Sequence, residues 1–256
     1  MSYAFRDTEL AARRLIYLAG VFADTTRDFV IEAIADTPGL VIDLGCGPGC
    51  TTRLLAEATG CPDVVGLDES EYFLSIAAKG APDGLRFIQH DVTVTPFPAG
   101  PADLMFCRYL LTHIGDPAGC IAGWATQLKP GGLLLCEEDD RLEVANPVFR
   151  EYIDIVTGML AAQSNTLEIG PILDNVADSA GLTKVASSVI EVRPPDHESA
   201  TMFYMNIQTW KHNRFILDNY ESARIEDLEA RLKAASEHES RESTMEFHLR
   251  RLVFRR

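Results

Sequence analysis

The stretch that decides the fold is V-I-D-L-G-C-G-P-G, at residues 41–49. An apolar run ends in an acid, and three glycines at alternate positions then lead into a helical pattern over residues 51–58. This order predicts a strand, a tight turn and a helix. Glycine has no Cβ, so a ligand can approach the backbone closely, and the first N–H groups of the helix lack partners within it. We therefore predict a pocket for a nucleoside-type ligand at this turn.

The spacing of the glycines separates this turn from a dinucleotide site. It reads G-x-G-x-G, whereas the dinucleotide fingerprint G-x-G-x-x-G places its third glycine one residue later. Asp43 stands just before the turn, where a carboxylate would repel a pyrophosphate but suits an ammonium or sulfonium group. Glycine-rich turns of this kind also serve many other doubly wound folds, so the motif alone leaves the ligand open.

Two further predicted strands end in acids that suit a nucleoside. Residues 64–68 form an apolar strand that ends at Asp68, where a carboxylate can hold ribose hydroxyls. Residues 85–89 form the next strand and lead to Asp91 and Val92. Asp91 can accept a hydrogen bond from an exocyclic amine, and Val92 can lie against a base. For either acid taken alone, an ordinary loop aspartate is the alternative.

The fourth predicted strand, residues 102–107, runs into R-Y-L-L-T-H at 108–113, and a Pro-Gly-Gly turn within 128–138 precedes a fifth strand. His113 therefore leaves the sheet on the side where open α/β sheets bind ligands. With an ordinary pKa near ~6.5 it can accept a proton, so we predict it as a general base. The alternative is a histidine that packs the following turn.

This order of parts resembles the class I S-adenosylmethionine-dependent methyltransferase family, over roughly residues 38–140. Within that family the chain is most similar to the bacterial small-molecule methyltransferases. The resemblance implies S-adenosylmethionine as cofactor. It also implies a doubly wound, seven-stranded and mostly parallel α/β sheet of order 3-2-1-4-5-7-6, with the last strand antiparallel.

The resemblance also implies roles for individual residues. The glycines would wrap the methionine and ribose, and Asp43 would lie near the methionine amino group. Asp68 would hold the ribose, Asp91 would face the adenine amine, and Cys107 and Arg108 would close the methionine end. The implied cofactor-binding set is Asp43, Gly45, Cys46, Gly47, Gly49, Asp68, Glu69, Asp91, Val92, Cys107 and Arg108. Cys50 departs from the family pattern, since a small polar residue is common there.

Composition favours a globular enzyme with a small substrate. The 256 residues carry 23 Lys and Arg against 38 Asp and Glu, a net charge of −15. Such a molecule repels phosphate backbones, so we expect no nucleic-acid partner. Hydrophobic content of 46% and charged content of 24% are ordinary, and we expect one domain over residues 1–256.

Cysteine usage and the N-terminal residues indicate the compartment. The six cysteines form no C-x-x-C pair and have no histidine at zinc spacing, so we expect no metal and a reducing environment. Charged residues interrupt residues 1–18, and no run approaches the ~20 apolar residues of a membrane span. We therefore expect a cytoplasmic protein without a membrane partner.

Outside the resemblance, the pattern predicts mostly helices. Residues 7–35 should form two helices, so that residues 1–36 make an N-terminal helical cover. Two more helices are expected after the fifth strand, and a sixth strand stops at a Pro-Pro pair before the last strand. These predicted elements are helices at 146–162 and 170–180 and strands at 184–192 and 246–254.

The segment 196–240 is predicted to be a two-helix insertion rich in aromatic and Met side chains. We interpret it as a lid or a wall of the substrate pocket; a homodimer interface or an addition to the core are the alternatives. The acidic run 137–140 should end the fifth strand, where it could attract an amine or form a solvated loop. The predicted substrate-binding residues are Tyr17, Tyr109, Glu137, Tyr204 and Trp210.

The expected function is methyl transfer from S-adenosylmethionine to an oxygen or nitrogen of a small metabolite. The sulfonium activates the donor, so the protein must mainly align the nucleophile and remove any proton. Fold does not fix function, so a non-methylating, cyclase-like catalyst on the same scaffold stays open. A protein or RNA methyltransferase is a weaker alternative because of the acidic composition.

Overall fold

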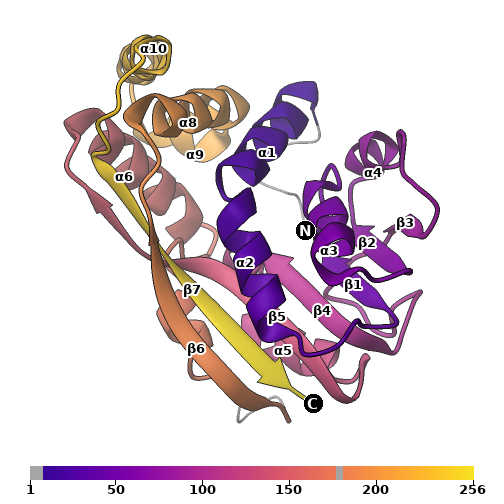
Figure 1. The fold of residues 1–256 in the computed structure, drawn as a ribbon. Coiled ribbons are helices and arrows are strands. Elements are labelled where there is room, and N and C mark those ends of the chain that lie inside the picture. The colour runs from indigo at the N-terminus through magenta and orange to yellow at the C-terminus, as the bar shows by residue number, and fades with distance from the viewer. Residues whose placement is uncertain (1–7, 177–180) are drawn as a thin grey trace.

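The computed structural model describes residues 8–176 and 181–256, which form one α/β unit around a seven-stranded sheet (Figure 1). The strands are β1 (Val41–Leu44), β2 (Val64–Asp68), β3 (Leu85–Gln89), β4 (Ala102–Arg108), β5 (Leu128–Val144), β6 (Thr183–Val192) and β7 (Met245–Arg255). The helices are α1 (Glu9–Val21), α2 (Ala23–Ala33), α3 (Cys50–Thr59), α4 (Glu71–Ala77), α5 (Pro117–Ala125), α6 (Pro147–Ala161), α7 (Gly170–Leu173), α8 (Asp196–Trp210), α9 (Arg214–Asn219) and α10 (Ser222–Glu237), with a 3-10 turn at Leu111–His113.

The strand order is β3-β2-β1-β4-β5-β7-β6, which confirms the predicted order. Strands β1 to β5 pair in parallel, and β7 pairs antiparallel with both β5 and β6. The carboxyl ends of the parallel strands therefore meet at one edge. The residues after β1, β2, β3 and β4, which carry the predicted site, are brought together there.

The central strands are apolar because helices cover both faces of the sheet. On one face, Phe29 and Val30 of α2 and Leu55 of α3 pack on the sheet. On the other face, Ile121 and Trp124 of α5 fill the same role. No helix in the described ranges combines the length and the apolar character that a membrane crossing requires.

The two N-terminal helices are present as predicted and meet at a single buried residue. Thr8 caps α1 by accepting a hydrogen bond from the N–H of Ala11. Phe22, fully buried, ends α1 and begins α2. Figure 1 shows α1 between the helices α8 and α9 on one side and α3 and α4 on the other. The N-terminal helices are therefore placed to wall one side of the sheet edge.

Strands β5 and β7 are longer than the sequence indicated, and this length corrects the interpretation of the acidic run. β5 continues through residues 137–140 to Val144 and stays paired with β7 along that course. Glu137, Glu138 and Asp139 are 0%, 1% and 8% exposed, so the prediction of a solvated loop was wrong. Sequence reasoning missed this because the partners of Glu137 and Glu138 come from distant parts of the fold, and because burial raises the pKa of Glu138 and of Asp139.

The insertion before β7 contains three helices, not two. The chain turns after Trp210, and Asn213 starts α9 by accepting a hydrogen bond from the N–H of Phe215. The predicted helix at 170–180 was also too long, because α7 ends at Leu173. Its last part, residues 177–180, lies outside the described residues.

The insertion builds a second hydrophobic core with α6 and the extended ends of β5 and β7. Phe203 of α8 stacks on Tyr152 of α6 with ring centroids 4.2 Å apart. Trp210 is 1% exposed and lies 6.0 Å from the same tyrosine ring. Of the alternatives considered for this segment, the structure shows the addition to the core.

Because Trp210 fills this second core, we expect Trp210→Ala to lower the free energy of unfolding by about 3–5 kcal/mol, the usual effect of removing a large buried aromatic. Urea unfolding followed by circular dichroism measures the change. Leu217→Ala on α9 is the control, because Leu217 is 58% exposed and should shift stability by less than about 0.5 kcal/mol. Equal stability of wild type and Trp210→Ala would contradict the placement of this side chain.

Candidate functional site

A cavity of about 600 Å³ opens at the carboxyl ends of β1, β2, β3 and β4. The turn at 45–48, the residues after β2 and β3, and residues 108–110 form its floor and one end. Leu15, Leu18 and Ala19 of α1 also line the cavity, as do residues 113–114, Gln163 and Asn165. The cavity thus lies where sequence reasoning placed the nucleoside pocket.

The glycine turn owes its shape to left-handed backbone. Gly45, Gly47 and Gly49 have φ of +66°, +51° and +80°, a region that other residues rarely adopt. A Cβ on Gly45 would lie 2.8 Å from Leu110 Cδ1, and one on Gly49 would lie 2.8 Å from Ala77 Cβ. The backbone itself therefore forms the cavity floor, and it feeds directly into α3.

Asp68 is the acid that the structure orients most clearly toward a ribose. Its Oδ2 accepts a hydrogen bond of 2.8 Å from the N–H of Gly47, and its Oδ1 accepts one of 2.9 Å from the N–H of Ser70. The carboxylate is thus fixed between the first and second strand ends, and it lines the cavity together with Glu69. Each oxygen keeps acceptor capacity for ligand hydroxyls.

Asp91 and Val92 lie at the same end of the cavity, as predicted. The N–H and hydroxyl of Thr93 donate to Asp91 Oδ1 at 2.9 and 2.7 Å, and the hydroxyl bond lowers the pKa of this carboxyl. Asp91 is therefore an ionised acceptor at neutral pH. The carbonyl of Val92 is held by Trp124 Nε1 at 2.7 Å, so its side chain is fixed at the wall.

Two predicted cofactor residues lie behind the cavity wall rather than in it. Asp43 is 2% exposed and accepts a 2.7 Å hydrogen bond from the Thr52 hydroxyl. Burial raises the pKa of Asp43 to about 7, against the hydrogen bond from Thr52 and the charge of Arg108. Cys107 is fully buried in β4. Gly49 does not line the cavity either, whereas Gly45, Cys46 and Gly47 do.

Arg108 and Tyr109 reach the cavity from the end of β4. Arg108 Nη1 donates a 2.7 Å hydrogen bond to the Thr26 hydroxyl of α2. Tyr109 has φ of +53°, and its ring meets Phe22 edge-on at 5.6 Å between centroids. Its hydroxyl is buried, so Tyr109 presents its ring rather than its hydroxyl to the cavity.

His113 lines the cavity from the 3-10 turn that follows β4. Burial, with a smaller contribution from the charge of Arg14, lowers its pKa to about 4. Its turn is held in place because Glu138 Oε1 accepts 2.8 Å hydrogen bonds from the N–H groups of Leu110 and Leu111. His113 is therefore a neutral imidazole at pH 7, and its titration lies well below the predicted value near ~6.5.

Four of the five predicted substrate residues do not line the cavity. Glu137 is bonded within the protein to Thr26 and Arg251, and Trp210 belongs to the second core. Tyr17 and Tyr204 pack against that same core. Tyr109 does line the cavity.

The cavity also contains residues that sequence reasoning missed. Leu15, Leu18 and Ala19 share one face of α1, and their helical spacing was a signal that could have identified this wall. Gln163 and Asn165 follow α6, and nothing in their local sequence indicates that the fold brings them to the cavity.

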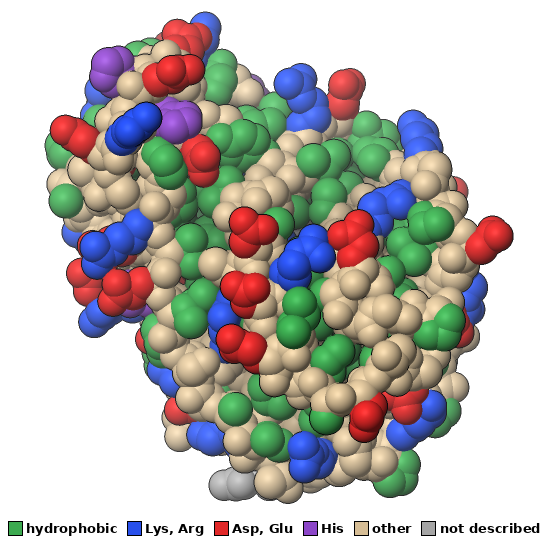
Figure 2. All heavy atoms as spheres, viewed as in Figure 1, with side chains coloured by type: hydrophobic (Ala, Val, Ile, Leu, Met, Phe, Trp, Pro, Cys, Tyr) green, Lys and Arg blue, Asp and Glu red, His purple; other side chains and the backbone are tan. Residues whose placement is uncertain are grey.

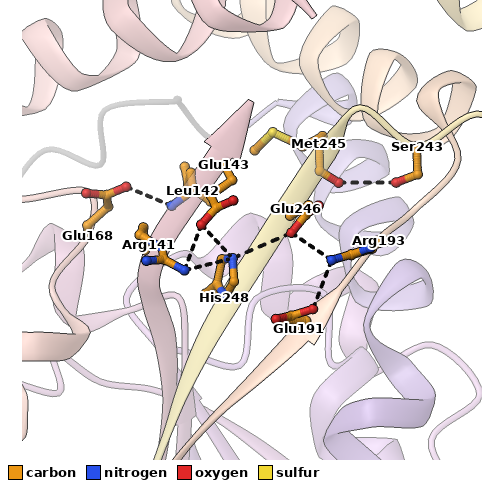
Figure 3. Close-up of polar contacts among 10 residues, drawn as sticks. All are labelled: Arg141, Leu142, Glu143, Glu168, Glu191, Arg193, Ser243, Met245, Glu246 and His248. Carbon is orange, nitrogen blue, oxygen red and sulfur yellow. Dashed lines mark hydrogen bonds and ion pairs between the residues drawn. The ribbon is translucent and has the colours of Figure 1, made fainter. Parts of the chain in front are cut away.

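A separate polar cluster lies on the extended strands β5 and β7 (Figure 3). Possible ligand atoms of Glu143, Glu246 and His248 lie within 4.8 Å of one another. Arg141 pairs with Glu143 at 2.7 Å and Arg193 with Glu246 at 3.0 Å, so cations of the protein already compensate both acids. We interpret this cluster as a cross-strand network of ion pairs.

Part of this chain matches known proteins in sequence. Residues 42–136 match the family described as a methyltransferase domain. Among curated proteins, the chain is 37% identical over 118 residues to the trans-aconitate 2-methyltransferase of Delftia acidovorans, covering 45% of this chain and 44% of that protein. The chain spans less than half the length of the first curated relatives that it matches.

Solved structures share the fold at low sequence identity. Phosphoethanolamine N-methyltransferase 2 of Haemonchus contortus, in complex with S-adenosyl-L-methionine, has a TM-score of 0.60 at 17% identity, over all of this chain and 58% of that chain. The [4+2]-cyclase SpnF has a TM-score of 0.58 at 20% identity, over 91% of this chain and 80% of that chain.

Residues 42–136 thus match a methyltransferase domain, and the strand order is the one that a resemblance to the class I S-adenosylmethionine-dependent methyltransferases implies. The predicted resemblance to this family is thereby confirmed over residues 42–136, with S-adenosylmethionine as the cofactor of the class.

We expect Asp68→Ala to weaken S-adenosylmethionine binding by ~1–3 kcal/mol, because hydrogen bonds to a charged acceptor are lost. Titration calorimetry measures the dissociation constant. Asp63→Ala is a matched control on the other end of β2, where Asp63 pairs with Arg86 at the surface. Unchanged binding in Asp68→Ala, with the wild type binding, would contradict the assignment of the ribose acid.

The low pKa of His113 predicts how stability responds to acid. Between pH 6.5 and 4 the unfolded chain binds a proton on this imidazole and the folded chain does not, so stability falls as pH is lowered through this window. His113→Gln should lose less stability than the wild type over the same window, measured by urea unfolding at each pH. Buried Asp43 and Glu138, whose pKa values are raised to about 7, contribute with the opposite sign to both proteins. Parallel pH profiles of the two proteins would refute the buried, neutral histidine.

Proposed function

We propose that this protein transfers the methyl group of S-adenosylmethionine to a carboxylate oxygen of a small anionic molecule. The observation that carries the proposal is the division of charge along the cavity. Asp68, Glu69 and Asp91 line the cavity after β2 and β3, whereas the lining residues after β4 and α6 include the neutral His113, Gln163 and Asn165.

The nucleoside end fits the cofactor. Asp68 is held by two backbone N–H groups with acceptor capacity left for the ribose, and ionised Asp91 suits the adenine amine. The glycine turn lets the methionine part lie against backbone. Arg108 lines the cavity and would pair with the carboxylate of the methionine part. Buried Asp43 accepts a hydrogen bond from Thr52 and so connects the end of β1 to α3 beneath the turn.

The other end suits an anionic acceptor. His113, Gln163 and Asn165 offer neutral polar groups, and the positive charge of Arg14 acts on His113. Among the described residues that line this end, none is acidic. An anion is favoured here and an amine is not, because a bound ammonium would meet positive potential without a counter-charge. The curated relatives named for trans-aconitate, a carboxylate compound, support the same substrate class.

Methyl transfer to a carboxylate requires the protein mainly to bind and align the two reactants. When bound, S-adenosylmethionine supplies a methyl group on a sulfonium, which passes to the carboxylate oxygen as its carbon–sulfur bond breaks. A carboxylate is already deprotonated at neutral pH, so no side chain has to act as a base. The role that this leaves for His113 is orientation of the acceptor by hydrogen bonding, in place of the general base predicted from sequence.

A small substrate also fits the surface. The net charge is −15, and Figure 2 shows basic side chains scattered among acidic ones on the face that it presents. A polyanionic nucleic acid would be repelled by this charge. The likeness to the [4+2]-cyclase concerns the fold alone and does not bear on the reaction. The mass of the product distinguishes the cyclase-like alternative from methyl transfer.

We expect trans-aconitate, used as the probe, to gain one methylene unit in mass with release of one S-adenosylhomocysteine, and a matched amine of similar size to gain none. Mass spectrometry of the products measures both. If trans-aconitate is inert, a panel of dicarboxylates and tricarboxylates tests the class. Methylation of amines alone would contradict the carboxylate proposal, and an isomer of unchanged mass would support the cyclase-like alternative.

A further inference from the structure

A buried chain of hydrogen bonds runs from the N-terminal helices to the cation of the cavity. The hydroxyl of Thr26, on α2, accepts the 2.7 Å hydrogen bond from Arg108 Nη1. The same hydroxyl donates to Glu137 Oε2 at 2.5 Å. Thr26 is fully buried, and its one proton is directed to the carboxylate. Its oxygen is therefore turned to accept from Arg108.

Glu137 is itself fixed from the far side. Its Oε1 accepts a 2.9 Å hydrogen bond from Nε of Arg251 on β7. Arg251 also donates to the carbonyl of Thr25, and its guanidinium lies 5.1 Å from the ring centre of Phe29. Glu137 and Arg251 are 0% and 7% exposed in this arrangement. Elements distant in sequence thus hold Thr26 in one orientation.

Along this series of hydrogen bonds, Arg108 is the positive charge that lines the cavity. Glu137 is one carboxylate between two guanidinium groups, and its direct ion pair is with Arg251. Arg108 reaches it only through the Thr26 hydroxyl, and its other support is the Tyr109 ring, 5.9 Å from the guanidinium carbon. An anion bound in the cavity would complement Arg108, whose guanidinium is oriented by the neutral Thr26 hydroxyl and also interacts with the charge of buried Asp43.

We propose that Thr26 is a positioning residue for cofactor binding, and that with Glu137 it holds Arg108 where the guanidinium pairs with the carboxylate of the methionine part. The inference rests on the proposed function, because it assigns Arg108 to the amino-acid end of S-adenosylmethionine. It explains why a polar residue of α2, Thr26, is buried against the sheet. The N-terminal helices thereby set the geometry of the site as well as covering it.

The test compares two ligands that differ in the amino-acid group. S-Adenosylhomocysteine carries the carboxylate, and 5′-methylthioadenosine shares the nucleoside but lacks it. Thr26→Val keeps the size of the side chain and removes the hydroxyl. We expect it to weaken S-adenosylhomocysteine about tenfold, as for one hydrogen bond to a charged group, and to change 5′-methylthioadenosine less than about twofold. Titration calorimetry at constant pH and salt measures both constants.

Three further variants make the result specific. Thr26→Ser keeps the hydroxyl and should restore the wild-type ratio of the two affinities. Thr25→Val is the matched control, because the Thr25 hydroxyl only donates to the carbonyl of Phe22. In an Arg108→Met background, Thr26→Val should leave the ratio unchanged, since the group it positions is gone.

Thr26→Val leaves a buried carboxylate oxygen with one donor fewer, so thermal unfolding is measured in parallel. If that variant does not fold, Thr26→Cys replaces it, because the thiol is a weak donor of similar size. Thr26→Cys should lower the affinity for S-adenosylhomocysteine, relative to that for 5′-methylthioadenosine, about threefold. Equal weakening of both ligands, no weakening of either, or a change confined to the acceptor's KM would each overturn the inference. Failure of the wild type to bind either ligand would instead overturn the proposed function.

Discussion

The left-handed turn between β1 and α3 is the constraint on which the site depends. Its three glycines let the chain reverse within five residues while Leu110 and Phe87 pack directly against the backbone. That close approach puts the N–H of Gly47 within hydrogen-bonding distance of Asp68, which fixes the carboxylate at the next strand end. A side chain at Gly45 would clash with Leu110, and one at Gly49 would clash with Ala77 and Phe87, so the ligand site and the sheet edge share one geometric cause.

Charge is divided along the cavity because different parts of the fold supply its two ends. The acids follow β2 and β3, where parallel strands place them side by side. The cation follows β4 and is held by α2 through a buried hydroxyl, a carboxylate and a second arginine. Such buried charges persist only when each is hydrogen-bonded, and here α2, β5 and β7 provide the partners together. The N-terminal helices are consequently part of the site's electrostatics.

The extended β5–β7 pair explains why the molecule has a second hydrophobic core. Both strands run past the parallel sheet, and helices α6, α8, α9 and α10 cover the apolar side chains that this length exposes. The aromatic residues of the insertion pack in that core, and the cavity is lined instead by residues of α1 and of the segment after α6, among others. An insertion rich in aromatic residues thus serves stability, and its position beside α1 supports the cavity wall from outside.

The sequence by itself determined the elements whose signals are local. The glycine turn, the strand end at Asp68, the acid Asp91 after β3 and the two N-terminal helices were predicted and found, because periodicity and turn chemistry act over a few residues. The strand order was implied by the family resemblance, and the structure has the same order. Only the tertiary structure decided the burial of residues 137–139, the low pKa of His113, the place of Trp210 in a core and the arrival of Gln163 at the cavity. Each of these depends on partners far away in the chain. The acidic run 137–140 suggests a solvent-exposed loop in the sequence, because Arg251, which pairs with Glu137, lies far away in the chain. The pKa of His113 is lowered by burial, and burial exists only once the chain has packed.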